Sequence, residues 1–222
     1  MNSLEPYKIY IDQNPQTPRW DTLTAALKEA EKPDAVIIEL GTCHSFVDGR
    51  FEGCDCPDIK YWHPDKPEMW DWGAGIFSIM AAIALPQAQI WTADLSGEAL
   101  TRCQVMTEPY ANRFHYVHDD AVHFLQEFQG QADLIYMDTG YVWPPEPTAT
   151  NTFDQARTIV ERQLLREGGK ILIDDTNSIV PAEYGEPCPV SKSRYSLPYF
   201  LANGFEIELQ KYQTVLKKRA KS

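Results

Sequence analysis

Short apolar runs alternate with longer stretches of helical spacing along most of this chain. The run Val36–Leu40 is continuously apolar except for Glu39, which is typical of a buried strand, and apolar residues between positions 19 and 33 recur on one helical face. The same reading predicts further strands at 88–94, 113–120, 132–138 and 170–175 and helices at 76–86, 97–110, 121–128, 153–169 and 196–204.

Strands joined by helices at this rhythm predict a parallel sheet with helices on both faces. The C-terminal part departs from it, because residues 205–210 and 212–218 both have strand patterns and only Lys211 lies between them. Two strands so close in sequence can pair only in antiparallel fashion. We therefore expect an α/β fold, Rossmann-like and doubly wound, with a mostly parallel seven-stranded sheet and an antiparallel C-terminal hairpin.

Composition restricts the partners. The 222 residues suit one domain, 1–222, and carry 20 Lys plus Arg against 32 Asp plus Glu, a formal charge of -12, which disfavours a nucleic-acid partner. The N-terminus has no basic and then apolar leader pattern, and no apolar run approaches the roughly 18 residues of a spanning helix, so we expect a cytoplasmic protein without a membrane partner. Five cysteines form an odd set, and reduced thiols are expected.

Acidic residues lie where the expected strands end. In open α/β sheets, ligands bind beyond the carboxyl ends of the strands. An Asp at such a position can alternatively cap the following helix, but acids at the ends of five successive strands favour a binding site. These acids are Glu39, Asp94, Asp120, Asp138 and the pair Asp174 and Asp175.

The turn after the first strand is unusual, because Gly41 is not followed by a second glycine before the next helix pattern near Ile76. We interpret residues 46–72 as an insertion that forms a lid, with Gly73 and the residues after it opening the helix. A competing registration with the turn at 71–77 is weaker, since two prolines precede it. Zinc at Cys54, Cys56 and His63, with Cys43 and His44 upstream, is less favoured because the spacing is not that of a zinc knuckle.

These motifs resemble the class I methyltransferases that use S-adenosylmethionine, over residues 20–218, and most closely the metal-dependent O-methyltransferases of small molecules. The resemblance implies that Asp94 accepts the ribose hydroxyls, that the Asp120–Ala121 step binds adenine and that Glu39 orders the loop at the methionine part. The cofactor-binding residues that it implies are Glu39, Gly41, Thr42, Gly73, Asp94, Leu95, Asp120 and Ala121.

For the reaction, the resemblance implies that Mg²⁺ binds to Asp138, Asp174 and Asp175 and activates a hydroxyl of the acceptor. Asp138, His44 and Tyr141 are the candidate catalytic residues. The general base is left open, and His63 is a further candidate.

The acceptor is expected to be a small molecule, because the loop after Asp138 lacks the Pro-Pro-aromatic motif of enzymes that methylate bases. Lys192 and Arg194, in a second loop, could bind an anionic group. The alternatives are a metal-independent methyltransferase of the same fold, an NAD-dependent oxidoreductase and a binding protein without activity. Assembly into a homo-oligomer is left open.

Overall fold

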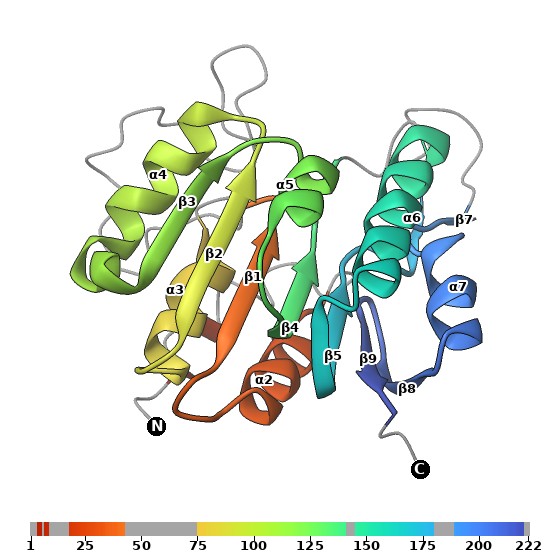
Figure 1. Cartoon of the computed structure of the whole chain (residues 1–222), viewed down its shortest axis with the longest axis horizontal. Coiled ribbons are helices and arrows are strands. Elements are labelled where there is room, and N and C mark those ends of the chain that lie inside the picture. The colour runs from red at the N-terminus through yellow and green to blue at the C-terminus, as the bar shows by residue number, and fades with distance from the viewer. Residues whose placement is uncertain are drawn as a thin grey trace.

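A computed structural model describes residues 4–5, 7–8, 18–42, 75–140, 145–179 and 189–219. Its main sheet has seven strands in the order β3-β2-β1-β4-β5-β9-β8 (Figure 1). The first five are parallel, and β9 pairs antiparallel with both β5 and β8, which confirms the predicted fold class. The strands are β1 (Val36–Leu40), β2 (Gln89–Asp94), β3 (Phe114–His118), β4 (Ala132–Met137), β5 (Leu165–Ile173), β8 (Phe205–Gln210) and β9 (Thr214–Lys218).

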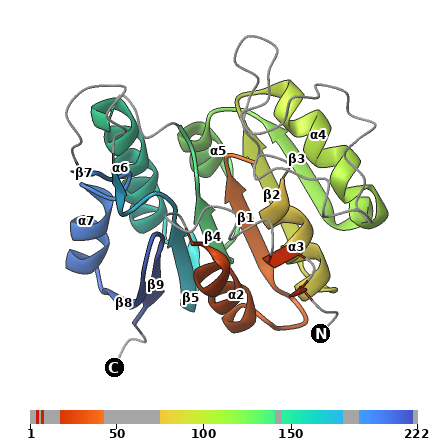
Figure 2. The ribbon, with the colours of Figure 1, turned by 180° about the vertical axis from the view of Figure 1, so that it is seen from behind.

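Helices cover both faces of the sheet. One face carries α2 (Trp20–Glu29) and α3 (Ile76–Ala84), and α3 in turn contacts α4 (Gly97–Thr107), which the short 3₁₀ helix η3 (Glu108–Arg113) follows (Figure 2). The other face carries α5 (Ala121–Glu127), α6 (Pro145–Glu161) and α7 (Ser196–Ala202) (Figure 1). No helix in the described part of the chain combines the length and the apolar character needed to cross a membrane.

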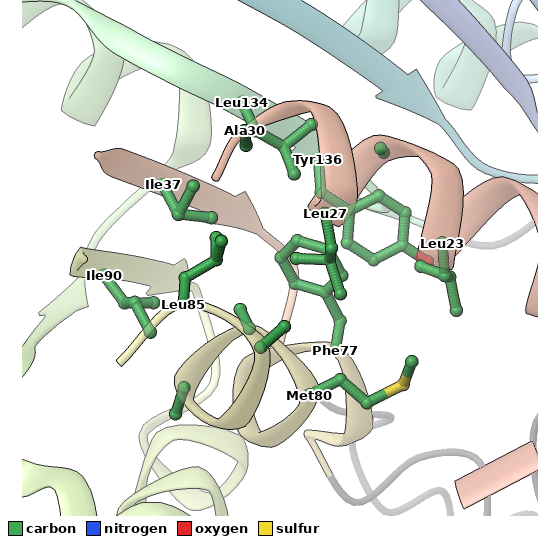
Figure 3. Packing of buried hydrophobic residues seen from close by; sticks show 14 of the residues in the cluster. Leu23, Leu27, Ala30, Ile37, Phe77, Met80, Leu85, Ile90, Leu134 and Tyr136 are labelled. Carbon is green, nitrogen blue, oxygen red and sulfur yellow. The ribbon is translucent and has the colours of Figure 1, made fainter. Parts of the chain in front are cut away.

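The apolar face predicted for the first helix is buried against the sheet. Leu23 and Leu27 of α2 lie beside Phe77 of α3 and Tyr136 of β4 (Figure 3). The rings of Phe77 and Tyr136 have centroids 4.5 Å apart. This packing fixes the N-terminal end of α2 over the carboxyl ends of the central strands, where the acids lie.

The helix expected at 153–169 is displaced in the structure. Helix α6 starts at Pro145, in the first turn where proline is tolerated, and it ends at Glu161. Gln163 closes it with a φ of 54°, a left-handed conformation that glycine usually supplies. Gly168 and Gly169 lie inside β5, where Gly169 passes close to the backbone of Asp133 beside a register shift between β4 and β5.

A two-stranded ribbon, β6 (Ser178–Ile179) and β7 (Pro189–Val190), was not predicted. Its strands pair antiparallel, so the chain leaves the end of β5 and returns toward it. Lys192 is the second residue after β7, and its backbone N–H donates to the Asp175 carbonyl at 3.3 Å. The ribbon therefore returns a basic residue to the acids at the end of β5.

Candidate functional site

The acids at the ends of β4 and β5 converge as predicted. Asp138, Asp174 and Asp175 each offer a carboxylate oxygen, and these oxygens lie within 4.8 Å of one another. Asp174 is 1% exposed, whereas the side chain of Asp138 is 20% exposed. Asp175 adopts a φ of 49°, which is uncommon outside glycine and frequent at functional positions. We refer to these three residues as the acid cluster.

Arg19, just before α2, pairs with two members of the acid cluster. Its Nε and Nη2 donate to the two oxygens of Asp174, each at 2.9 Å, and Nη2 also donates to Asp175 at 3.1 Å. The guanidinium lies 4.5 Å from the ring centroid of Tyr212, whose hydroxyl donates to Asp175. Arg19 is therefore a buried, two-pronged partner of the cluster, with 8% of its surface exposed.

Lys192 supplies a second buried cation. Its Nζ lies 2.7 Å from Asp138 Oδ1 and 2.9 Å from Asp175 Oδ2, and the residue is 3% exposed. The two carboxylates raise the pKa of Lys192, outweighing the opposite effect of its burial, so it stays charged at neutral pH. Sequence analysis placed Lys192 in a loop at the pocket but did not place it against the acids.

Neutral side chains complete this arrangement. The Tyr136 hydroxyl donates to Asp138 at 3.0 Å, and Gln213 Nε2 donates to Asp174 at 2.8 Å. Burial and the neighbouring Asp174 charge raise the pKa of Asp138 well above its usual range. For Asp174, burial alone would raise the pKa, but the Arg19 guanidinium outweighs that effect and lowers it.

The arrangement of the acid cluster does not suit a divalent metal ion as it stands. An octahedral Mg²⁺ needs oxygens at about 2.0–2.1 Å, and it keeps several waters. Here both oxygens of Asp174 bind the Arg19 fork, and Lys192 Nζ bridges the other two carboxylates. A metal ion could bind only after one of these cations had moved away.

The second part of the site is the turn after β1, which joins the end of β2. The N–H of Gly41 donates to the Ala93 carbonyl at 2.8 Å, and that of Thr42 donates to Asp94 Oδ2 at 2.9 Å. Oδ1 of Asp94 accepts from Ser96 N at 2.7 Å. Beside this acid, the apolar side chain of Leu95 is 70% exposed. The pair Asp94 and Leu95 thus offers a carboxylate and an uncovered apolar surface side by side.

Asp120 starts helix α5. Its Oδ1 accepts from the backbone N–H groups of Val122 and His123 at 2.9 and 3.1 Å, while Ala121 is buried beneath it. The capping role that we weighed as an alternative is therefore present. Among the described residues no donor binds Oδ2 of Asp120, so this oxygen can accept from a ligand as well.

Glu39 lies beneath the site instead of opening onto it. It is 1% exposed, and its Oε2 accepts from the hydroxyls of Ser78 on α3 and Thr92 on β2 at 2.6 and 2.8 Å. Burial raises its pKa to about 7, although these hydroxyls act in the opposite direction. Glu39 thus ties α3 and β2 to the strand whose end forms the turn.

Several predicted site residues lie outside the described residues. They are His44, Tyr141 and Gly73, together with the insertion 46–72 and its zinc candidates. Helix α3 does begin at Ile76, as expected, and Gly75 before it has a φ of 70°. The cation missed by the sequence analysis is Arg19, which no local pattern separates from other basic residues, because it lies 155 positions before its partner Asp174.

No protein-family model matches the sequence, and no curated protein does. Solved structures match the fold. A putative O-methyltransferase from Klebsiella pneumoniae superimposes with a TM-score of 0.60 at 15% identity, over 98% of this chain and 88% of that one. The methyltransferase PaMTH1 from Podospora anserina, solved with S-adenosylhomocysteine bound, gives 0.59 at 14% identity, over 98% and 87%.

A third match is TrmN from Thermus thermophilus, with a TM-score of 0.54 and 17% identity. The match covers 88% of this chain and 48% of TrmN, so this chain spans about half the length of that protein. At these identities the likeness concerns the fold, and the observed strand order with its antiparallel β9 agrees with it. The chain therefore shares the Rossmann-like fold of the Klebsiella and Podospora methyltransferase structures.

Proposed function

We propose that this protein transfers the methyl group of S-adenosylmethionine to a hydroxyl oxygen of a small molecule. The observation that carries the proposal is the meeting of two sites at one sheet edge. The turn at Gly41 and Thr42, with Asp94 beside it, adjoins Asp138 of the acid cluster where the strand order reverses between β1 and β4. Ligands of open α/β sheets bind at such a point.

The residues at the turn suit the cofactor. Asp94 presents a carboxylate for the ribose hydroxyls, and the exposed Leu95 offers an apolar surface for the adenine ring. Oδ2 of Asp120 can accept from the exocyclic amine, because only Oδ1 caps α5. Once bound, S-adenosylmethionine supplies an electrophilic methyl group on a sulfonium, which needs only an aligned nucleophile.

The acid cluster is the acceptor side of the proposal. Asp138 is its partly exposed member and stands directly after the strand next to β1. An oxygen–methyl bond forms as the sulfur–methyl bond breaks, and the hydroxyl proton leaves to a general base that stays open between His44 and His63. Asp138 and Tyr141 are the other candidate catalytic residues. Assistance by Mg²⁺ stays a prediction, and the ion pairs of Arg19 and Lys192 favour the metal-independent alternative.

The nature of the acceptor is also part of the proposal. The formal charge of -12 disfavours a polyanionic acceptor such as RNA. A small hydroxylated molecule has no such repulsion to overcome. Transfer of labelled methyl groups to extracted RNA, with none to hydroxylated small molecules, would overturn this part while leaving the cofactor assignment intact.

Isothermal titration calorimetry of S-adenosylmethionine and NAD tests the cofactor. Losing the Asp94 carboxylate should weaken S-adenosylmethionine binding by roughly 10- to 100-fold, since a hydrogen bond to a charged group contributes about 1.5–3 kcal/mol. The control is Asp154→Ala, which removes a partly exposed acid paired with Arg157 on α6. Binding of NAD alone, or equal affinities in Asp94→Ala and wild type, would show that the strand-end acids serve another ligand.

A further inference from the structure

We propose that Lys192 and Arg19 take the place of a divalent cation at the acid cluster, so that the chain's own cations do the work of a metal ion there. The catalytic role of these two cations rests on the proposed methyl transfer. The structural part of the proposal, that the cluster is neutralised from within, stands on the ion pairs alone. Each of the three carboxylates has a cationic nitrogen at 2.7–3.1 Å.

The charges of the acid cluster are balanced by residues of the same chain. Three carboxylates packed together repel one another, and burial makes their repulsion costly unless cations lie beside them. Arg19 and Lys192, both buried, bring two positive charges to the three carboxyl groups. The cluster thus has its counter-charges built in when the chain folds.

The two cations lie where a metal ion would have to bind. A metal ion shared by Asp138 and Asp175 would sit between their oxygens, and Lys192 Nζ already lies there, 2.7 and 2.9 Å from them. The Arg19 fork occupies both oxygens of Asp174. Bidentate pairing of this kind leaves that carboxylate no unpaired oxygen to offer to a metal.

Neighbouring groups hold both cations in place. Arg19 stacks on Tyr212, and the same tyrosine donates to Asp175, so ring and hydroxyl both stabilise the pair. Lys192 is held through its backbone N–H to the Asp175 carbonyl. These contacts fix the cations in the fold and distinguish them from exposed ion pairs, which are weak and easily exchanged for water.

The arrangement also indicates how an acceptor would bind. An ammonium has three N–H donors. Nζ of Lys192 donates to Asp138 Oδ1 at 2.7 Å and forms an ion pair with Asp175 Oδ2 at 2.9 Å. We infer that a further N–H of this ammonium donates to an acceptor oxygen next to Asp138, whose side chain is the most exposed of the cluster. Lys192 would then hold the oxygen that a metal ion holds in the metal-dependent enzymes.

Mn²⁺ binding to the ligand-free protein tests this without any turnover. Electron paramagnetic resonance should detect no Mn²⁺ bound by wild type up to about 1 mM, the weak end of protein sites for divalent cations. Lys192→Met removes one cation and should create a site that binds Mn²⁺ at least about tenfold more tightly. Arg157→Met, which removes an exposed cation of α6, should leave the wild-type result unchanged.

Two results would overturn the proposal: Mn²⁺ binding by wild type that Asp175→Asn abolishes, or no gain of Mn²⁺ binding in a folded Lys192→Met variant. Thermal unfolding reports whether that variant folds. If it does not, Lys192→Gln removes the charge while keeping a donor of similar length, and the same outcomes apply to it.

Failure of the proposed function gives a different pattern. Absence of S-adenosylmethionine binding would refute the function and leave the Mn²⁺ results unaffected. If the cofactor binds and an acceptor has been found, EDTA should change the rate of methyl transfer by less than about twofold, because no metal takes part. If the cofactor binds but EDTA abolishes turnover, the proposed role of Lys192 is refuted and the proposed function is retained.

Discussion

Substituting Glu39 by glutamine should change how the stability of the ligand-free protein depends on pH. Burial raises the pKa of Glu39 from 4.5 to about 7, so the folded state binds a proton more tightly than the unfolded state does. The stability that this provides is fully present below about pH 4.5 and is lost as the pH rises through about 7. Above that range wild type carries a buried carboxylate charge, whereas the Glu39→Gln variant does not.

The pKa shift sets the magnitude. At about 1.4 kcal/mol per unit, a rise from 4.5 to about 7 corresponds to about 3 kcal/mol. Glutamine also adds an amide donor, but the hydrogen bonding of this amide does not depend on pH. The effect of the carboxylate charge is therefore measured as the change, with pH, in the stability difference between Glu39→Gln and wild type. Relative to wild type, Glu39→Gln should gain about 2–3 kcal/mol in free energy of unfolding between about pH 5 and about pH 8.

Urea unfolding at a series of pH values measures this difference. The control is Glu31→Gln, which neutralises an exposed acid just after α2 and should give a curve parallel to that of wild type. If Glu39→Gln also ran parallel to wild type, the Glu39 carboxylate would have its ordinary pKa and its burial would have no electrostatic cost. The hydrogen bonds from Ser78 and Thr92 would then have to compensate fully for the burial.

Two further predictions concern the turn and the cofactor. In urea unfolding, Gly41→Ala should destabilise the protein by at least about 1 kcal/mol more than Gly204→Ala. Both glycines have a φ near +85°, but only at Gly41 would a Cβ lie 2.6 Å from the Asp138 carbonyl oxygen. Equal losses of stability in the two variants would mean that this clash is relieved at no cost. Leu95→Ala should weaken S-adenosylmethionine binding roughly tenfold in calorimetry without lowering stability, because an apolar side chain that a ligand covers contributes about 1.5 kcal/mol to binding. The control is Leu201→Ala, on the exposed side of α7. Unchanged affinity in Leu95→Ala would place the adenine elsewhere.

The fold could be predicted largely because its signals are local. Val36–Leu40 was predicted to the residue, since a continuous apolar run has few alternatives, and the short link at Lys211 allowed only an antiparallel pair. The boundary between α6 and β5 was wrong for an equally physical reason. Gln163 closes the helix in a conformation that glycine usually takes, so the two glycines that follow were read as the helix end.

The candidate site also has one part that the sequence predicted and one that it did not. Asp138, Asp174 and Asp175 could be placed together because the carboxyl ends of adjacent parallel strands meet. Their partners could not, because Arg19 reaches them only through the packing of α2 on the sheet, and Lys192 only through the ribbon β6–β7. Acids at strand ends indicate that positive charge is needed, but the sequence pattern does not distinguish a metal ion from a distant arginine or lysine.

Gly41 connects the two halves of the proposed site. Its N–H bonds to the end of β2, while Asp138 N–H bonds to the Leu40 carbonyl at 2.9 Å, so the cofactor turn and the acid cluster continue one hydrogen-bonded ladder. Their separation is therefore set by the spacing of neighbouring strands. Methyl transfer requires the donor carbon and the acceptor oxygen to be held a little over 3 Å apart, roughly the near-attack distance. In the proposed function, Arg19 and Lys192 hold the acceptor side of that distance once α2 has packed on the sheet and the ribbon β6–β7 has brought Lys192 to the acid cluster.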